Sequence, residues 1–442
     1  MTVEGQKKRY AIVGLGSRSA MYSEALLGSF SAYGDLVAYC DVNQTRMDYY
    51  NRRYAASFGV PPTPTYDAQD FDRMLDEQRV DTVIITSIDR THHRYSIRAM
   101  EQGCDVISEK PLTVDAPKCQ AILDAQKRTG RRLTVTFNYR YAPRNSKVKE
   151  LLQQGVIGRI LSVHFEWVLD TWHGADYFRR WHRDKRNSGG LMVHKASHHF
   201  DLVNWWLDSV PETVFGFGDL VFYGRENAEE RGETRFYERA YGSAAAREDP
   251  FALHLDEDDT LRQLYLEAEH EDGYLRDQSV FGQGISIEDD MAVLVRYRNG
   301  ATMTYHLNAY APWEGYRVMF NGTKGRLEVM VEERSYVSGA RDDLNQPDLR
   351  DAQTVQPPSA PQIVLRPLWG QPLTIAVPAA AGGHGGGDVR LLEDLFNPER
   401  PPDPLRRAAD HVAGAMAALT GIAANTSFAT ALPVRVADLV RF

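Results

Sequence analysis

Residues 10–19, YAIVGLGSRS, decide the fold of this chain. Residues 10–13 form a short apolar run with two β-branched side chains, closed by glycine, and this predicts a buried strand. A helical pattern of apolar residues runs from residue 20 to about residue 30. Glycines between such a strand and such a helix are typical of a dinucleotide-binding fingerprint. The stretch therefore predicts the first strand–helix unit of a nucleotide-binding sheet.

Two glycines give this fingerprint its chemistry. Gly14 allows the tight turn, and Gly16 lets a pyrophosphate approach the backbone at the helix N-terminus. Ser17 and Arg18 belong to the same turn, so we expect them to contact the cofactor too. Ser19 stands where a third glycine is usual; that position serves helix–strand packing, and serine is small enough for it.

The second predicted strand, residues 36–41 (LVAYCD), ends in a carboxylate. Asp41 is suited to the two ribose hydroxyls of NAD and would repel the 2′-phosphate of NADP. A plain turn or N-cap role for Asp41 is the alternative. Arg46 could serve a 2′-phosphate, so NADP stays open beside NAD.

Strands and helices keep alternating up to about residue 140. Further strands are predicted at residues 82–86, 105–108 and 133–137, with helices after residue 93 and over about residues 115–128. Such alternation predicts a parallel, doubly wound sheet whose ligands bind at the carboxyl ends of the strands. We therefore expect an α/β protein with a Rossmann domain over residues 1–140.

Composition limits the classes of function. The chain has 442 residues, 43% hydrophobic and 25% charged, with a formal net charge of −9. This acidic balance argues against a nucleic-acid partner. No apolar run reaches about 18 residues and no signal-peptide pattern opens the sequence, so we expect no membrane partner. Cys40, Cys104 and Cys119 are scattered and odd in number, which favours a reducing compartment, the cytoplasm.

A charged turn follows the strand at residues 105–108. Glu109, Lys110 and Pro111 stand at the carboxyl end of a parallel strand, a position well suited to meeting a nicotinamide ring. A surface turn in which proline ends the strand is the plainer alternative.

Six segments together resemble the Gfo/Idh/MocA oxidoreductases, the family named for glucose–fructose oxidoreductase and inositol dehydrogenase. In chain order they are GLGSRS, VAYCDVN, TSIDRTHH, SEKPLTVD, NYRYAP and SGGLMVHKASHHFD, and the resemblance extends over nearly the whole chain. It implies that a C-terminal α+β domain, residues 141–442, follows the Rossmann domain and contains a large, open, mainly antiparallel sheet. One face of that sheet would pack on helices. The other is commonly used for oligomerisation, which implies a homodimer or homotetramer.

The resemblance also implies roles for particular residues. Lys110 would contact both the reacting hydroxyl and the cofactor, lowering the energy of negative charge on the substrate oxygen. Its peptide bond to the following proline is often cis in the family. Glu109 and His92 would lie at the cofactor, with His92 flanking the nicotinamide. Asn138 and Arg140 match positions that line the cleft between the domains.

Residues 188–206, SGGLMVHKASHHFDLVNWW, concentrate ionisable groups. Family members usually read GG-x-x-x-D-x-G-x-H-x-x-D here, with the Asp and the His as the catalytic pair. This chain has His194 at the aspartate position, His198 at the histidine and Asp201 at the final aspartate. On one helix these three would share a face. His198 is the expected general base, while His194 and Lys195 hold substrate or form a second proton-transfer pair.

Two other interpretations of this segment stay open. Histidines four residues apart can bind zinc, but HKASH lacks the glutamate of HExxH, and Lys195 would add a cation beside the metal, so we expect no metal. A core helix accounts for the apolar side chains from Phe200 onward. It does not account for Lys195 and the histidines together.

The segment HKASHHFD resembles the corresponding segment in a branch of the family that acts on glycosides. Trp172 and Trp181 precede it, in WHGADYFRRWHRDKRNSGG, and such residues suit the face of a sugar, although aromatic side chains also simply pack. His384, in the run GGHGGGD before a helix predicted to reach residue 396, would extend into the cleft; a flexible hinge is the alternative. A long helix is predicted at residues 404–424.

A highly charged insertion occupies about residues 222–285, with short helices expected around residues 259–270. A lid, a subunit contact and a solvated excursion all stay open for it.

These observations favour an NAD-dependent oxidoreductase that oxidises a ring hydroxyl of a sugar or glycoside, or reduces the ketone. The alternative is a redox-neutral, NAD-dependent glycosidase that works by oxidation, elimination, hydration and re-reduction. A cofactor-bound regulator without activity is disfavoured, because Lys110 and His198 are both present.

Overall fold

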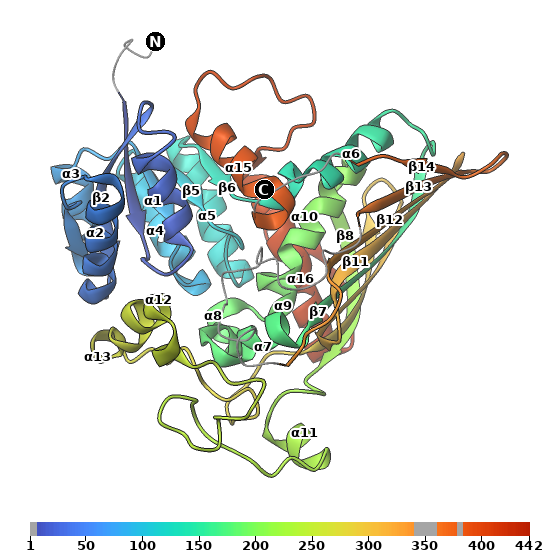
Figure 1. The fold of residues 1–442 in the computed structure, drawn as a ribbon. Coiled ribbons are helices and arrows are strands. Elements are labelled where there is room, and N and C mark those ends of the chain that lie inside the picture. Colours follow the sequence, from blue (N-terminus) through green and yellow to red (C-terminus); the bar gives the residue numbers. More distant parts are fainter. Residues whose placement is uncertain (1–6, 340–359, 378–382) are drawn as a thin grey trace.

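Two β-sheets and the helices around them make up the computed structural model, which describes residues 7–339, 360–377 and 383–442. The N-terminal part of the chain builds six strands of a seven-stranded sheet, here sheet A. The rest of the chain supplies the seventh strand and builds a nine-stranded sheet, here sheet B. Figure 1 shows sheet A with its helices on one side of the molecule and sheet B on the other.

Sheet A has the doubly wound order β15-β6-β5-β4-β1-β2-β3, in which β1 to β6 are parallel. The predicted strands and the Rossmann fold are confirmed. The strands from the N-terminal part are β1 (Lys8–Val13), β2 (Gly34–Asp41), β3 (Thr65–Asp67), β4 (Thr82–Ile85), β5 (Asp105–Ser108) and β6 (Leu133–Val135). The helices among them are α1 (Ser19–Leu27), α2 (Gln44–Phe58), α3 (Phe71–Glu77), α4 (His92–Glu101) and α5 (Ala116–Thr129).

Sheet B has the order β14-β13-β12-β11-β7-β10-β9-β8-β16 and is antiparallel except for the pair β7–β10. This confirms the mainly antiparallel second sheet. Its strands are β7 (Ile160–Asp170), β8 (Pro211–Asp219), β9 (Asp290–Tyr297), β10 (Thr302–Ala311), β11 (Glu314–Gly322), β12 (Gly325–Arg334), β13 (Gln362–Pro367), β14 (Leu373–Ile375) and β16 (Val434–Arg435). Figure 1 shows the helices between the two sheets covering one face of sheet B, while its other face carries no helix of the described chain.

The other helices, which follow β6 along the chain, carry several of the predicted site residues. They are α6 (Pro143–Gln153), α7 (Thr171–Arg179), α8 (Lys185–Ser188), α9 (Leu191–His194), α10 (Ala196–Leu207), α15 (Gly383–Phe396) and α16 (His411–Thr430).

The last long helix begins later than predicted. Residues 404–424 were expected to be helical, but α16 starts at His411, because Asp410 accepts a hydrogen bond from Ala413 N (2.9 Å) and acts as its N-cap. Residues Ala409–Asp410 instead form β15, which pairs antiparallel with β6, so the C-terminal part of the chain completes sheet A.

α16 is apolar and, at 20 residues, long enough to cross a membrane by length and composition. It packs against β8 and α10, and 67% of its most apolar window is buried inside the protein. It is therefore a core helix.

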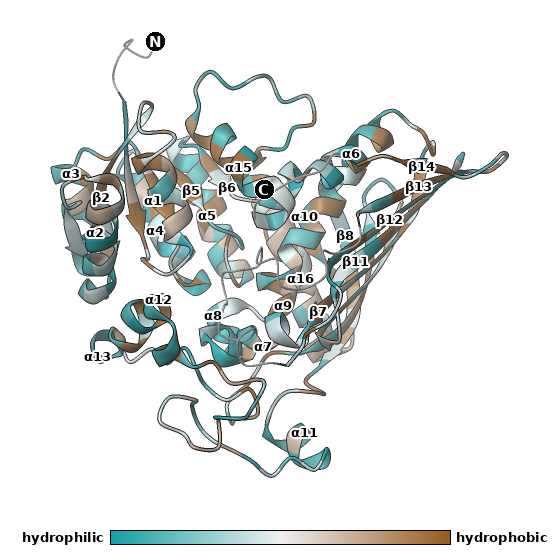
Figure 2. Cartoon of the chain, in the orientation of Figure 1, coloured by the Kyte–Doolittle hydropathy of each residue, from teal (hydrophilic) through white to brown (hydrophobic). Residues whose placement is uncertain are grey.

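The charged insertion lies between β8 and β9 of sheet B, and part of it contacts α2 beside sheet A. It contains α11 (Arg225–Glu230), α12 (Asp259–Leu261), a π-helical turn (Arg262–Leu266) and α13 (Glu269–Asp272). Figure 2 shows α12 and α13 largely in hydrophilic colours, yet in Figure 1 they lie beside the end of α2, and the π-turn contacts α2.

Candidate active site

The glycine turn after β1 fits a dinucleotide. Gly14 has a φ of +91°, and a Cβ there would lie 2.4 Å from the Ser87 backbone, so only glycine is accommodated. A Cβ on Gly16 would meet the Tyr265 hydroxyl at 3.8 Å, an ordinary van der Waals contact. Ser17 N donates to that hydroxyl (3.1 Å). Ser19 bonds back to the Gly16 carbonyl oxygen (2.7 Å), so the serine at the third position closes the turn.

Asp41 lies at the carboxyl end of β2, where the fold places an adenosine ribose. Its carboxylate accepts hydrogen bonds from Leu15 N and from Asn43 N (3.0 Å). Burial raises the pKa of Asp41, and these backbone donors and Arg46 act in the opposite direction. The carboxylate is thus fixed beside the glycine turn.

The turn after β5 is held by buried side chains. Glu109 pairs with Arg18 Nε (2.6 Å) and accepts a hydrogen bond from the Tyr22 hydroxyl (2.7 Å). Although burial opposes its charge, Arg18 holds the pKa of Glu109 below its usual range. The Lys110–Pro111 peptide bond is cis. His92 lies with its ring nitrogens 2.8 Å from the Pro111 carbonyl oxygen and 2.9 Å from that of Ser87.

These contacts give a structural role to three residues predicted to contact the cofactor. Arg18 and Glu109 pair with each other, and the ring of His92 is engaged by two carbonyl groups. All three therefore fix the turn that carries Lys110, and their contact with a cofactor stays a prediction.

A chain of three side chains forms the centre of the site. Lys110 Nζ lies 3.3 Å from His194 Nε2 and donates to the His194 carbonyl oxygen (3.1 Å). His194 Nδ1 lies 2.5 Å from Asp89 Oδ2. Because an ammonium can only donate, Lys110 requires Nε2 to be the acceptor, so Nδ1 carries the proton and donates to Asp89.

Aromatic rings surround His194. The His182 ring centroid lies 4.1 Å from that of His194, the Tyr177 centroid 5.5 Å and the Trp181 centroid 6.0 Å. Burial, together with Lys110 and His182, lowers the pKa of His194 well below its usual value. The imidazole is thus kept neutral.

A second histidine lies nearby on α10. His198 packs on Tyr139, with ring centroids 4.5 Å apart, and its Nδ1 is buried without a hydrogen-bond partner in the described part of the chain. Burial and the cations Lys110 and Lys195 lower its pKa. Lys195 Nζ donates to the Tyr139 hydroxyl (3.4 Å) and lies 4.8 Å from the Trp167 ring centroid.

The predicted single helix through His194 and Asp201 is two helices. α9 ends at His194 and α10 begins at Ala196, with Lys195 between them. The break lets the His194 carbonyl group accept from Lys110 instead of closing a helical hydrogen bond.

The C-terminal glycine loop reaches the same region. His384 adopts a left-handed conformation (φ 53°), and its ring centroid lies 5.4 Å from that of Tyr139 and 6.2 Å from that of His198. His384 Nδ1 bonds to Asp388 (2.8 Å), which also accepts from Asn138 Nδ2 (2.6 Å). The structure thus brings His384 and Asn138 to the His198 side of the site.

Two residues predicted to contact substrate are buried beside other groups of the protein, and their contact with substrate stays a prediction. Arg140 forms a bidentate ion pair with Asp201, with N–O distances of 2.7 and 2.5 Å, and its remaining nitrogen faces backbone carbonyl oxygens. Arg140 is 5% exposed, and its ion pair with Asp201 holds it against α10. Trp172 is also buried, and the guanidinium carbon of Arg334 lies 4.4 Å from the Trp172 ring centroid.

Sequence reasoning missed Asp89, Tyr139 and the insertion residue Tyr265. Asp89 had a usable signal, because it stands in TSIDRTHH just after β4, at the carboxyl edge of the parallel sheet. Tyr139 and Tyr265 had none, since tyrosines at such positions usually pack.

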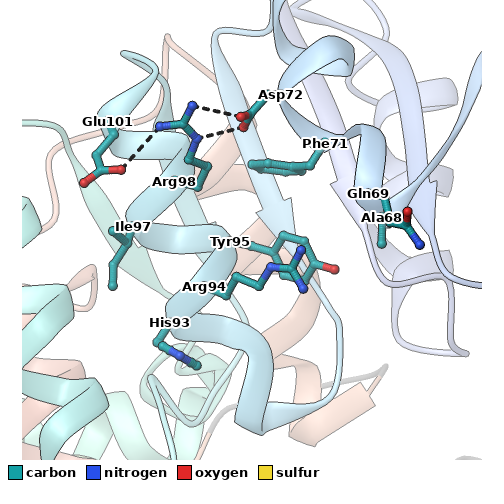
Figure 3. Close-up of a pocket in the computed structure, with 10 residues that line it drawn as sticks. All are labelled: Ala68, Gln69, Phe71, Asp72, His93, Arg94, Tyr95, Ile97, Arg98 and Glu101. Atoms are coloured by element: carbon teal, nitrogen blue, oxygen red, sulfur yellow. Dashed lines mark hydrogen bonds and ion pairs between the residues drawn. The ribbon is translucent and has the colours of Figure 1, made fainter.

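A surface pocket lies away from these groups, between α3 and α4. Figure 3 shows its lining, including the Arg98–Asp72 ion pair, and none of the predicted site residues is among the side chains drawn. Within residues 7–339, 360–377 and 383–442, no group of three His, Cys, Asp or Glu side chains is placed to hold a metal ion.

The glycine turn, Asp89 and Lys110 follow β1, β4 and β5, so they share one edge of sheet A, where dinucleotide-dependent oxidoreductases place their cofactor. The chain belongs to the Gfo/Idh/MocA oxidoreductase family. Residues 8–137 match the profile described as "Oxidoreductase family, NAD-binding Rossmann fold", and residues 149–434 match "Oxidoreductase family, C-terminal alpha/beta domain".

Three similar proteins show how far the likeness extends. YteT of Bacillus subtilis (strain 168), named as an oxidoreductase, is 36% identical over 94% of each chain. Inositol 2-dehydrogenase/D-chiro-inositol 3-dehydrogenase of Lactiplantibacillus plantarum is 27% identical over 46% of this chain and 53% of its own. The solved WlbA dehydrogenase of Bordetella pertussis, in complex with NADH and UDP-GlcNAcA, superposes with a TM-score of 0.60 and 17% identity, covering 97% of this chain and 99% of its own. The last likeness concerns the fold alone.

Proposed function

We propose that this protein oxidises a ring hydroxyl of a sugar or glycoside, or reduces the corresponding ketone, with NAD as the redox partner. The observation that carries the proposal is the hydrogen-bonded chain Lys110–His194–Asp89 at the carboxyl edge of the nucleotide-binding sheet. A cation, a neutral base and a carboxylate that orients the base are the groups that alcohol oxidation requires.

The cofactor would be held by the glycine turn and Asp41, and when bound NAD supplies the acceptor for the hydride that leaves the carbinol carbon. Lys110 donates a hydrogen bond to the substrate oxygen and stabilises its developing negative charge. His194 Nε2 removes the hydroxyl proton. Asp89 holds the imidazole in the reactive tautomer and stabilises the imidazolium that forms.

His198 is the second candidate for the base. The resemblance to the family aligned it with the catalytic histidine, whereas the hydrogen bonds to Lys110 and Asp89 favour His194. Because His198 lacks a carboxylate partner on its buried Nδ1 within the described residues, we assign it the role of a substrate contact, together with Lys195 and His384.

Aromatic side chains at the site and the names of similar proteins both support a carbohydrate substrate. Trp181, Tyr177 and Tyr139 provide aromatic surface at the two histidines, and such surface suits the apolar face of a pyranose. A curated relative acts on inositol, and a neighbour in fold holds a nucleotide sugar.

A redox-neutral glycosidase is the second candidate function. It needs an additional base for elimination after the first oxidation, and the second imidazole that His198 brings to the site beside Tyr139 favours it.

Mass spectrometry of the purified protein with NAD and a panel of sugars and glycosides tests both candidates. A product lighter by two hydrogens with equal NADH supports the dehydrogenase, whereas free sugar plus aglycone without net NADH supports the glycosidase.

Lys110→Ala should lower turnover about a hundredfold or more, because it removes the charge that faces the substrate oxygen. Lys118→Ala, on α5, is the control; equal turnover of both variants would remove Lys110 from the mechanism.

We also propose a homo-oligomer formed through the uncovered face of sheet B, and a cytoplasmic location. Phe217 and Leu294 project from that sheet with 60% and 53% of their surface exposed. The three cysteines are free and buried, as suits a reducing compartment. Sedimentation and cell fractionation test these two proposals.

A further inference from the structure

The charged insertion is fixed to both parts of the molecule. On the nucleotide side, Asn43 Nδ2 donates to the Ala268 carbonyl oxygen (2.8 Å), and the Tyr265 hydroxyl accepts from Ser17 N (3.1 Å). On the other side, Arg276 Nη1 pairs with Asp176 of α7 at 2.9 Å. The insertion therefore lies along the edge of the cofactor site instead of extending into solvent.

One insertion carboxylate occupies the N-terminus of α2. Glu271 accepts hydrogen bonds from Gln44 N (2.5 Å) and Thr45 N (2.8 Å). These two N–H groups follow closely after Asp41, the residue assigned to the ribose. A helix N-terminus beside the ribose is a ready site for a phosphate, and here it is already filled by an anion of the protein.

A second insertion carboxylate neutralises the neighbouring cation. Arg46 Nη1 pairs with Asp272 Oδ2 at 2.6 Å, and Arg46 Nε donates to the Leu264 carbonyl oxygen (3.2 Å). The guanidinium carbon also lies 5.8 Å from the ring centroids of both Tyr265 and Tyr274. Arg46, which could have received a 2′-phosphate, is thus bound inside the insertion.

We propose that Glu271 and Asp272 are specificity-determining residues that exclude NADP from this site. Asp272 and Asp41 both act on the Arg46 guanidinium group, and Glu271 adds a third carboxylate at the start of α2. A 2′-phosphate would add about two more negative charges there, whereas the ribose hydroxyls of NAD are neutral and can donate to Asp41. The proposal rests on the cofactor site of the proposed function, but on no assumption about the substrate.

The test is isothermal titration of NAD and NADP into the full-length protein and the variant Glu271→Gln/Asp272→Asn. The wild type should bind NAD more tightly than NADP. In the variant, NADP affinity should rise about tenfold or more, because two like charges near the 2′ position are removed. NAD affinity should change by less than about threefold, since the substituted side chains are nearly isosteric. The thermal midpoint reports folding, and Asp272→Asn alone, which keeps Glu271 on α2, is the second variant.

The matched control is Asp259→Asn/Glu267→Gln. It removes the same charge from the same segment, where both carboxylates pair with Arg262. A wild type that prefers NADP, a control that gains as much NADP affinity as the variant, or a loss of both cofactors in Asp272→Asn would each overturn the proposal. Failure to oxidise any sugar would leave these affinities measurable, so the two proposals fail separately.

Discussion

His194 differs from an exposed histidine through three contacts. Asp89 fixes its tautomer, Lys110 opposes its protonation, and burial removes the water that would stabilise the imidazolium. Burial also raises the pKa of Asp89. The surroundings of Asp89 and His194 therefore disfavour a charge on either side chain alone. A proton arriving from a substrate hydroxyl would form an imidazolium that the Asp89 carboxylate stabilises.

The pH profile should reflect this environment. The folded-state pKa of His194 lies below its ordinary value of about 6.5, so the neutral base persists as the pH falls through that value. We expect the acidic limb of kcat/KM to lie below pH 6.5. Because the unfolded chain takes up the proton first, stability should also begin to decline as the pH drops through about 6.5. An acidic limb above pH 7 would contradict this assignment.

Asp89→Asn should separate orientation from binding. An amide cannot stabilise the imidazolium and can hold the wrong tautomer, so kcat should fall about a hundredfold or more with little change in KM. Steady-state kinetics with the identified sugar measures this. Asp72→Asn, which removes a surface carboxylate paired with Arg98, is the control. Equal kcat values for the two variants would show that Asp89 does not orient the base.

Sequence reasoning succeeded for residues whose chemistry depends on a local pattern. Lys110 and His194 stand at positions that their own segments define, so both could be singled out, although the sequence favoured His198 as the base and the contacts with Lys110 and Asp89 favour His194. Arg140 could not, because its partner Asp201 lies 61 residues away and turns an apparent cleft residue into a buried ion pair.

At the scale of elements, α15 shows how a loop is positioned by backbone contact. Gly387 approaches the Asn138 carbonyl oxygen so closely that a Cβ would lie 2.3 Å from it. This contact brings His384 and Asp388 to the site. The predicted close approach of the glycine loop thus has a specific cause, a helix start pressed against the segment Asn138–Tyr141.

Gly387→Ala should therefore move α15. We expect a loss of about 1–3 kcal/mol in the free energy of unfolding, because a methyl group must be forced against backbone. The KM for the sugar should rise as His384 is displaced. Val389→Ala on the same helix, at a side chain that is 63% exposed, should be neutral. Denaturant titrations of the two variants decide, and equal stability would show that the loop can yield.

Element boundaries were harder to predict than element types. Strands of sheet A were found because continuous apolar runs between turns are characteristic of buried parallel strands. The break at Lys195 and the late start of α16 escaped, since each depends on a tertiary contact: Lys110 at the first, and strand pairing with β6 at the second.

At the scale of the whole molecule, the uncovered face of sheet B predicts self-association. Phe217→Asp/Leu294→Asp places two charges on that face and should convert an oligomer to a monomer, because a buried unpaired carboxylate is costly. Sedimentation velocity measures this, with circular dichroism to confirm the fold. Val389→Asp, on α15, is the control. An unchanged sedimentation coefficient in the double variant would place the interface elsewhere.

The pairing of β15 with β6 has a consequence for how the chain is made. The edge of sheet A at β6 is covered by a strand that the ribosome supplies about 270 residues later. At bacterial and eukaryotic synthesis rates that interval is roughly 15–55 s. During it the nascent nucleotide-binding domain presents an open edge that other strands could join. Ribosome-bound chains that end before residue 409 should therefore depend on chaperones more than the finished protein does.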